Sequence, residues 1–223
     1  MKTKKAVVLV SGGLDSATTL YYAKNKGLEC FCLIFDYGQR HKKEIQKAIR
    51  IAKVASCSFK VVKIAFPWKG SALLDKTTRL PQGRPLKKIV KEIPSTYVPS
   101  RNIIFLSFAA SYAEAIGAQE IFIGANSLDY SGYPDCRPEF FKSFQAVLKK
   151  GTKVGVQSQS IKVRTPLIQK TKVQIIRMGL KLEVPYQLTW SCYQGGKRPC
   201  GKCDSCLLRQ KGFKQLGQKD PLL

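Results

Sequence analysis

The chain has 223 residues, 44% of them hydrophobic, which is typical of one substantial globular core and excludes a largely disordered protein. Lysine and arginine total 39 against 14 aspartates and glutamates, and the net charge of +25 favours polyanionic partners such as ATP or RNA. No apolar run reaches the roughly 20 residues that cross a membrane, and the apolar stretch at residues 6–10 is shorter than the about 7–15 residues of a signal-peptide core. We therefore expect a cytoplasmic protein with no membrane partner.

Strands and helices are predicted to alternate along much of the chain. Continuous apolar runs bounded by glycine or polar residues predict buried strands, and apolar residues three and four apart predict helices. We predict strands at residues 5–10, 30–35, 59–64 and 121–123, and helices at residues 15–26, 44–54, 102–116, 139–150 and 171–180. This alternation favours an α/β fold, a doubly wound parallel sheet that helices cover on both faces.

Several predicted boundaries depend on single residues. Residues 67–99 are rich in proline and lysine and predict a long surface loop. Ser100 or Asn102 is the expected cap of the next helix, which Gly117 ends, and Thr171 is the expected cap of the last predicted helix. The long helix should bury one face, formed by Phe105, Phe108, Ala109, Tyr112, Ala113 and Ile116.

The segment SGGLDS, residues 11–16, lies between the first predicted strand and the first helix. Glycines allow a tight turn close to a ligand, and the free N–H groups at a helix start attract anions. Ser11 and Ser16 add hydroxyl donors, and Asp15 offers a carboxylate for a Mg²⁺ ion that bridges phosphates. The motifs GxxxxGK[ST] and GxGxxG are both absent, which excludes a Walker loop and a dinucleotide fingerprint.

The eight cysteines fall into two groups. Four are dispersed and are expected to be ordinary reduced thiols: Cys30, Cys32, Cys57 and Cys136. The other four have spacings that suit one tetrahedral structural Zn²⁺: Cys192, Cys200, Cys203 and Cys206. An iron–sulfur cluster is the alternative. We therefore divide the chain into a nucleotide-binding domain at residues 1–184 and a small zinc module at residues 185–223 packed on it.

SGGLDS resembles the SGGxDS signature of the PP-loop ATP-pyrophosphatases, which implies that ATP is cleaved to AMP and pyrophosphate. Five further segments resemble the 7-cyano-7-deazaguanine synthase family of queuosine-precursor biosynthesis, and with SGGLDS they span nearly the whole chain. They are DYGQRH (36–41), PSRN (99–102), GANSLDYSGYPDCRPEF (124–140), TPLIQKTK (165–172) and LTWSCYQGG with CGKCDSCLLR (188–209). The family has alanine where this chain has Ser100, a departure that affects only local packing.

The resemblance implies a ligase that converts 7-carboxy-7-deazaguanine and ammonium to the nitrile with ATP and Mg²⁺. A carboxylate becomes a good electrophile only after attack on the α-phosphorus gives an acyl-adenylate, from which ammonia makes the amide. A second ATP can activate the amide oxygen for dehydration. The resemblance also implies a homodimer, and a free base, not nucleic acid, as the direct substrate.

Residue roles follow from the same resemblance. The expected ATP site comprises Val10, Ser11, Gly12, Gly13, Leu14, Asp15, Ser16, Ala17, Thr18, Thr19 and Leu20. Either Asp129 or Asp135 is expected to accept the two N–H donors of the guanine-like edge, and either Tyr130 or Tyr133 to stack on the ring. The other substrate-binding or catalytic candidates are Arg40, His41, Arg101, Asn126 and Arg137, of which the arginines suit the substrate carboxylate or the α-phosphate.

Two other functions compete with this hypothesis. The net charge encourages a PP-loop enzyme that modifies tRNA directly, although the chain has no obvious RNA-binding appendage. A zinc-dependent nucleic-acid-binding module without catalysis would leave SGGLDS unexplained.

Overall fold

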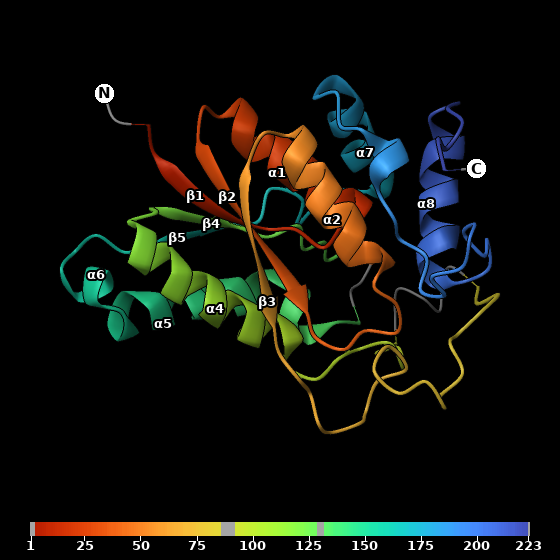
Figure 1. The fold of residues 1–223 in the computed structure, drawn as a ribbon, viewed down its shortest axis with the longest axis horizontal. Coiled ribbons are helices and arrows are strands. Elements are labelled where there is room, and N and C mark those ends of the chain that lie inside the picture. The colour runs from red at the N-terminus through yellow and green to blue at the C-terminus, as the bar shows by residue number, and fades with distance from the viewer. Residues whose placement is uncertain (1–2, 86–91, 129–131, 223) are drawn as a thin grey trace.

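The computed structural model describes residues 3–85, 92–128 and 132–222, and in these residues five parallel strands form one sheet in the order β3-β2-β1-β4-β5 (Figure 1). The strands are β1 (Lys5–Leu9), β2 (Glu29–Asp36), β3 (Ser58–Lys63), β4 (Glu120–Phe122) and β5 (Lys162–Arg164). The chain builds outward from β1 to β3 and then crosses to the other side of β1. The predicted doubly wound parallel sheet is confirmed.

Helices cover both faces of this sheet, with α1 and α2 on one face and α4 and α5 on the other (Figure 1). The main helices are α1 (Leu14–Asn25), α2 (Lys43–Val54), α4 (Arg101–Ile116), α5 (Pro138–Gly151), α7 (Lys172–Lys181) and α8 (Asp204–Gln215). The short ones are α6 (Lys153–Val156) and the 3₁₀ turns η1 (Pro134–Cys136) and η2 (Tyr186–Leu188). α7 packs against α1 and also against α8, which joins the C-terminal part of the chain to the α1 side of the sheet.

The central strand β1 explains why the sequence begins with an uninterrupted apolar run. Ala6 and Val8 contribute to the core under α1 and α2, whereas Val7 and Leu9 contribute to the core under α4 and α5. Successive side chains of a strand point to opposite faces, so a strand covered on both sides needs apolar residues throughout.

Helix α4 differs in two ways from the sequence-based expectation. Ser100 has a left-handed backbone (φ 55°) and its side chain makes no cap hydrogen bond, and Asn102 lies inside the helix. The carboxylate of Asp135 accepts the Asn102 N–H at 3.1 Å and caps α4 from another segment. Phe108, expected on the buried face, is 40% exposed, because the buried face turns toward Leu106 and Ala110.

Other boundaries agree with the predictions, and one strand and two α-helices of the described residues were not anticipated. Thr171 caps α7 in a capping box with Gln174, and Gly117 ends α4 with a positive φ of 68°. The edge strand β5, the short helix α6 and the helix α8 were all missed. Each lies where apolar periodicity is weak, or where cysteines and glycines dominate the sequence.

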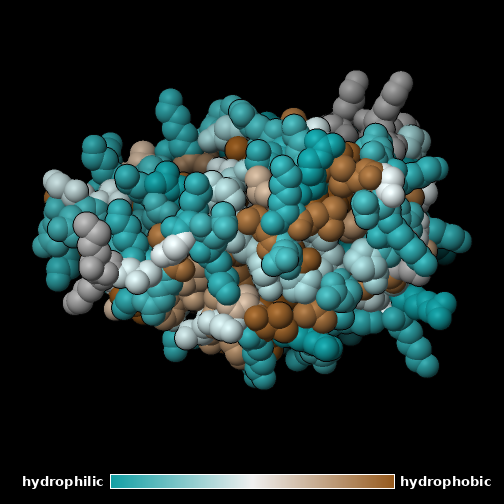
Figure 2. All heavy atoms as spheres, turned by 90° about the horizontal axis from the view of Figure 1, so that it is seen from above, coloured by the Kyte–Doolittle hydropathy of each residue, from teal (hydrophilic) through white to brown (hydrophobic). Residues whose placement is uncertain are grey.

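The predicted surface loop has neither helix nor strand in its described parts, residues 67–85 and 92–99. It packs against the cysteine segment, because the Gly83 N–H donates to the Lys202 carbonyl at 2.9 Å and Gln82 forms an isolated bridge with Cys203. Hydrophilic side chains cover much of the face seen in Figure 2. In the described part of the chain no helix has the length and apolar character that crossing a membrane demands.

Candidate active site

A cavity lies at the carboxyl ends of β1, β2 and β4, where the strand order reverses beside β1. Open α/β sheets bind ligands at this position. Apolar side chains from the sheet and α4 form part of its wall: Leu9, Leu33, Phe35, Phe105 and Ile123. Charged side chains from helices and loops complete the wall: Asp15, Arg40, Glu44, Arg101, Lys172 and Arg209.

The SGGLDS loop forms one end of the cavity. Ser16 Oγ accepts the Ser11 N–H at 3.1 Å and lies 3.0 Å from Ser11 Oγ, so the two hydroxyls connect across the loop. Gly13 is the N-cap of α1, and no side chain caps this helix. The start of α1 therefore offers backbone N–H groups to an anion in the cavity. Five residues predicted for ATP binding line the cavity besides Asp15: Val10, Ser11, Gly13, Leu14 and Ser16.

Two glycines allow other segments to approach this loop closely. Gly12 has φ +84°, and a Cβ there would lie 2.2 Å from the carbonyl oxygen of Glu44 in α2. A Cβ on Gly124, just after β4, would lie 3.0 Å from the backbone of Asp15. The loop is thus packed between α2 and the end of β4 without room for side chains. The remaining predicted nucleotide residues, Ala17, Thr18, Thr19 and Leu20, are buried in α1 below the loop.

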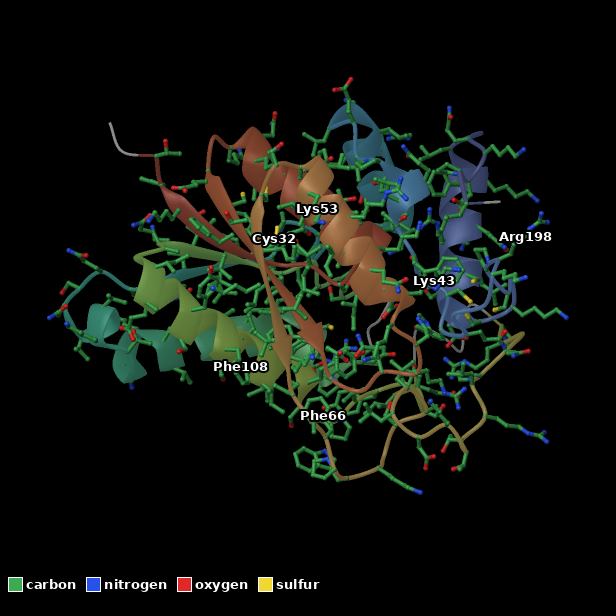
Figure 3. The ribbon with its side chains drawn as sticks, viewed as in Figure 1. Cys32, Lys43, Lys53, Phe66, Phe108 and Arg198 are labelled. Atoms are coloured by element: carbon green, nitrogen blue, oxygen red, sulfur yellow. The ribbon has the colours of Figure 1, made fainter. Side chains whose placement is uncertain are left out.

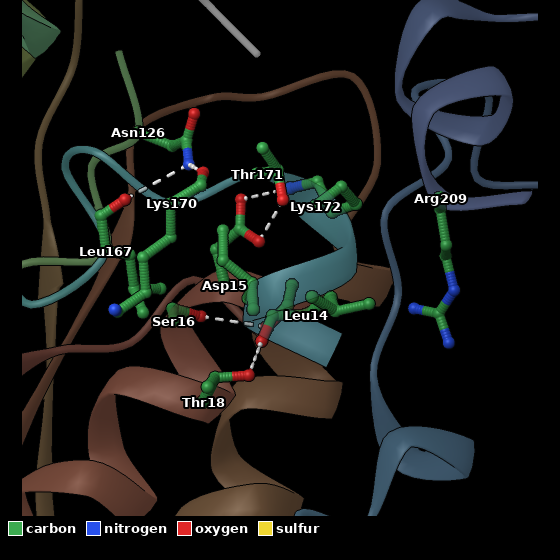
Figure 4. Close-up of polar contacts among 12 residues, drawn as sticks. Leu14, Asp15, Ser16, Thr18, Asn126, Leu167, Lys170, Thr171, Lys172 and Arg209 are labelled. Carbon is green, nitrogen blue, oxygen red and sulfur yellow. Dashed lines mark hydrogen bonds and ion pairs between the residues drawn. The ribbon is translucent and has the colours of Figure 1, made fainter. Parts of the chain in front are cut away.

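Asp15 forms an ion pair with Lys172, the first residue of α7 (Figure 4). The two carboxylate oxygens lie 2.7 and 2.8 Å from Lys172 Nζ, and the lysine is only 9% exposed. From the sequence alone, Asp15 is a candidate for holding a magnesium ion, and nothing identifies Lys172 as its partner. A lysine in the first turn of a helix gives no signal in the sequence, because such residues are usually solvated.

Arg101 and Glu44 bring opposite charges to the middle of the cavity. Arg101 Nη1 lies 3.4 Å from the Tyr37 hydroxyl, and its guanidinium lies 5.9 Å from the rings of Tyr37 and Phe105. Burial opposes its charge, but Tyr37 and Asp135 nearby raise the pKa of Arg101. Burial also raises the pKa of Glu44 to about 7, although the charge of Arg101 opposes this shift.

Arg40 is bound to the surface loop. Its Nη2 donates to the carbonyls of Asp75, Lys76 and Thr78 at 3.1, 2.9 and 2.6 Å. Its Nε is buried and has no partner among the described residues. Arg40 therefore lines the cavity while it fixes the loop, whereas the sequence analysis expected it to bind substrate.

The segment after β4 contributes two of its candidates to the cavity wall, Asn126 and Tyr133. Asn126 donates to the carbonyls of Leu167 and Lys170, and the Tyr133 hydroxyl lies 2.8 Å from Thr96 Oγ1. Asp135 is buried below the wall, where it caps α4, and Arg137 is exposed at the start of α5. The other two candidates, Asp129 and Tyr130, lie outside the described residues.

The four predicted metal ligands come together. The sulfur atoms of Cys192, Cys200, Cys203 and Cys206 all lie within 4.8 Å of one another. A tetrahedral ion with bonds of about 2.3 Å would separate its sulfur ligands by about 3.8 Å. Cys200 Sγ and Cys206 Sγ are 4.0 Å apart, so the donor set fits such an ion.

The surroundings of this cluster favour a thiolate at Cys192. The backbone N–H groups of Gln194 and Cys200 donate to Cys192 Sγ at 3.4 and 3.3 Å. Hydrogen bonds from the Cys203 and Cys206 thiols, supported by these two amides, lower the pKa of Cys192. Thiolates are the form in which cysteine binds a metal, so Cys192 is suited to be the first ligand of an ion in this cluster.

The cysteine segment is connected directly to the cavity. Trp190 donates its backbone N–H to the Gly12 carbonyl at 2.8 Å and its ring N–H to the Cys192 carbonyl at 2.9 Å. His41 Nε2 lies 3.0 Å from the same Cys192 carbonyl, which holds its ring against Gly195. Lys43 lies at the start of α2 (Figure 3), and its Nζ lies 3.7 Å from the centre of the Trp190 ring. His41 thus connects two segments, and its Nδ1 is buried with no partner among the described residues.

Arg209 of α8 was not identified from the sequence. It is 4% exposed and forms two hydrogen bonds with Asp220, at 2.7 and 2.9 Å. It also donates to Thr189 Oγ1 at 2.6 Å, next to Trp190. Arg209 therefore holds the end of the described chain, the η2 turn and the cavity wall together, a role that only the folded chain reveals.

The chain matches known proteins along most of its length. Residues 5–217 match the family model described as queuosine biosynthesis protein QueC. A 7-cyano-7-deazaguanine synthase from Thermoplasma acidophilum is 53% identical over 222 residues, covering 100% of this chain and 92% of its own. A protein of the same name from Nostoc punctiforme is 53% identical over 221 residues, covering 98% and 99% of the two chains.

The fold also resembles a solved structure of lower sequence similarity. An NMN synthetase from Francisella tularensis superposes with a TM-score of 0.51 and 15% identity over 97% of this chain and 78% of its own. At this identity the likeness shows the fold alone.

Proposed function

The chain belongs to the family of queuosine biosynthesis protein QueC, and on that premise we propose that it synthesises 7-cyano-7-deazaguanine, as the names of its relatives state. Its substrates are 7-carboxy-7-deazaguanine, ammonia and ATP, and it acts as a carbon–nitrogen ligase. One observation carries this proposal: the uncapped start of α1 opens into the same apolar-walled cavity as Arg101 and Glu44. An anion site and an aromatic base can therefore be held side by side.

ATP binds with its phosphates at the start of α1. The N–H groups of the SGGLDS loop approach the pyrophosphate portion, and Lys172 lies beside them on Asp15. Asp15 would hold the Mg²⁺ that accompanies ATP, and Lys172, which pairs with Asp15 here, would then contact the phosphates. The positive charges stabilise the negative charge that develops as the bond between the α and β phosphates breaks.

The carboxylate of the deazaguanine lies opposite Arg101. The guanidinium orients it for attack on the α-phosphorus, from which pyrophosphate departs and an acyl-adenylate remains. Ammonia then attacks the acyl carbon, and AMP leaves. The nitrogen must lose a proton in this step, and Glu44, with its pKa raised to about 7 by burial, is suited to accept it near neutral pH.

The amide reacts again in the same cavity. Its oxygen attacks the α-phosphorus of a second ATP, and loss of AMP with the remaining N–H protons gives the nitrile. Two oxygen atoms leave the carboxyl carbon in all, so each nitrile consumes two ATP.

The cysteine cluster holds one zinc ion, which is structural because four thiolates complete its shell. When bound, it supplies a fixed cross-link and no reacting group. Cys192, Cys200, Cys203 and Cys206 then keep Trp190 and His41 in place beside the SGGLDS loop.

The test is incubation of the purified protein with 7-carboxy-7-deazaguanine, ammonium and Mg²⁺-ATP in the absence of RNA. Chromatography should detect the nitrile together with AMP and pyrophosphate in equal amounts, two of each per nitrile. Formation of ADP and phosphate would contradict the proposed cleavage. Turnover that requires added tRNA would instead favour an enzyme that modifies tRNA directly.

A further inference from the structure

Three cysteines outside the zinc cluster lie together at the amino ends of two neighbouring strands. Cys30 and Cys32 belong to β2, and both contribute to the core under α1 and α2 (Figure 3 labels Cys32). Cys57 directly precedes β3 and packs on the same core. Because Phe31 pairs with Ser58 in the parallel ladder, one step back along this register places Cys30 beside Cys57. The sequence, where these residues are 27 positions apart, gives no sign of the cluster.

The three thiols differ in access. Cys30 and Cys32 are 6% and 0% exposed, whereas Cys57 is half-buried at the edge of the cluster. The ammonium group of Lys24 donates to the Ala55 carbonyl, to which the Cys57 thiol also donates, at 3.4 Å. A positive charge therefore lies near the one thiol that solvent reaches.

The Cys30 thiol donates to the Leu28 carbonyl at 3.6 Å, and the nearness of the three thiols shifts the pKa of each. The neighbouring Cys30 thiol, and then the Cys32 thiol, lower the pKa of Cys57, and the charge of Lys24 acts in the same direction against the effect of burial. Interaction with Cys57 raises the pKa of Cys30 and Cys32, which remain protonated. An accessible thiolate next to a protonated thiol is the arrangement that peroxide-sensitive cysteines share.

We propose that Cys57 is a site of oxidation by hydroperoxides, and that Cys30 is the thiol that then forms a disulfide with it. The Cys57 thiolate attacks one peroxide oxygen; the O–O bond breaks, the leaving oxygen takes a proton and departs as an alcohol or water, and Cys57 becomes a sulfenic acid. Cys30 sulfur next attacks the oxidised sulfur of Cys57. An S–S bond forms, and the hydroxyl group leaves as water with the thiol proton. One peroxide is reduced by two electrons, which the two thiols supply.

Backbone spacing allows this bond. Neighbouring strands lie about 4.8 Å apart, within the roughly 4.4–6.8 Å between the Cα atoms of disulfide-bonded cysteines. Cys32 pairs with Phe59 in the register, so Cys30 is the direct neighbour of Cys57. The site lies at the amino end of β2, whereas the cavity lies at the carboxyl end. Oxidation at Cys57 should therefore proceed without the loss of zinc-bound cysteines.

The experiment is peptide mapping of the zinc-loaded protein after treatment with an equimolar amount of hydrogen peroxide. Trypsin releases Cys30 and Cys32 together in residues 27–40 and Cys57 in residues 54–60. Mass spectrometry without reduction should find these two peptides linked in the wild type and in Cys32→Ser. The link should be absent in Cys57→Ser. In Cys30→Ser, dimedone should instead label Cys57 as the trapped sulfenic acid.

The controls make each outcome decisive. Cys136→Ser, a change at a buried thiol on the other face of the sheet, should form the link as the wild type does. If peroxide consumes the zinc cysteines while Cys57 stays unmodified, the proposal is wrong. If the link persists in Cys30→Ser and disappears in Cys32→Ser, Cys30 is not the second thiol. Retained ATP turnover in Cys57→Ser and Cys30→Ser would show that both variants are folded.

Discussion

The backbone N–H of Trp190 donates to the carbonyl oxygen of Gly12 at 2.8 Å, so a residue two positions before the first zinc-ligand candidate holds the centre of the SGGLDS loop. Cys192 reinforces this link, since its carbonyl accepts the Trp190 ring N–H and contacts His41. Hydrogen bonds therefore connect the four-cysteine cluster to the start of α1, although Gly12 and Cys192 are 180 positions apart in the chain.

We expect removal of the metal to weaken ATP binding as well as stability. In Cys203→Ser the zinc content should fall from about one per chain, because three thiolates hold the ion less firmly. Each kcal/mol lost in the free energy of unfolding should lower Tm by about 2–4 °C. Calorimetry should show weaker binding of a non-hydrolysable ATP analogue. Cys57→Ser is the control and should retain both properties. Normal nucleotide affinity in zinc-free protein would show that the cysteine cluster does not support the nucleotide site.

The ion pair between Asp15 and Lys172 should be sensitive to loss of either partner. Lys172→Met removes the ammonium group proposed to contact the phosphates, so the Kd for ATP should rise by one to two orders of magnitude, or about 1.4–2.8 kcal/mol. Asp15→Asn should retain the fold and lose most turnover, because the charge proposed to hold Mg²⁺ is removed. Steady-state kinetics and calorimetry would measure both.

A double variant tests whether Asp15 and Lys172 stabilise the protein through each other or independently. Each single substitution leaves the other charged group without its partner. The double variant Asp15→Asn with Lys172→Met should therefore lose less free energy of unfolding than the two single variants lose together. Strict additivity would mean that the two side chains do not interact. Lys149→Met, at an exposed position late in α5, is the control and should change neither the stability nor the Kd for ATP.

Glu44 should give the reaction a pH dependence near neutrality. Its pKa, raised to about 7 by burial, means that kcat should rise as pH increases through about 7 and the carboxyl group loses its proton. Glu44→Gln should lower kcat and remove this limb of the profile. Glu139→Gln, also in the first turn of a helix but exposed, should keep the wild-type profile. An unchanged profile in Glu44→Gln would exclude Glu44 as the proton acceptor.

Stability should respond to the same carboxyl group in a defined direction. The folded pKa of Glu44, about 7, lies above its ordinary value of 4.5, so the folded state binds its proton more tightly than the unfolded state does. This contribution to stability is complete below about pH 4.5 and is lost as pH rises through about 7. The difference in Tm between wild type and Glu44→Gln should therefore change across this window, whereas Glu139→Gln should follow the wild type.

The two aspartates proposed for the base edge should now behave differently. Asp135 caps α4 through the Asn102 N–H, so Asp135→Ala should cost about 1 kcal/mol of stability and lower Tm. Asp129→Asn should instead raise the KM for the deazaguanine with little change in Tm, because a donor would face the N–H groups of the ring at a cost of about 1–3 kcal/mol per unpaired group. Thermal scans and kinetics with varied base distinguish the two. Normal KM in Asp129→Asn would remove this residue from base recognition.

The parts of the fold that were predicted correctly are those with strong local signals. The apolar run of β1 and the capping box at Thr171 can be recognised within a few residues of sequence. The cysteine spacing likewise requires little knowledge of the remaining chain, and the four sulfur atoms do come together.

Side chains whose role depends on distant segments could not be predicted in this way. Lys172 becomes notable only when α7 packs on α1 and reaches Asp15, and Asp135 only when it meets the start of α4. Arg40 followed a strand in a recognisable motif, but its partners are loop carbonyls more than 30 residues away. In each case long-range packing, and not residue type, selects the contact.

The order in which the cavity wall is synthesised has a consequence for folding in the cell. The first strand and the SGGLDS loop leave the ribosome early, but Lys172, Trp190 and Arg209 belong to the last quarter of the chain. A growing chain that ends before residue 209 therefore has an incomplete pocket, and it gains no stability from abundant cellular ATP. Nucleotide binding begins to favour the folded state only after residue 209 has been added, so ATP stabilises chains that contain this residue and leaves shorter ones more exposed to proteolysis.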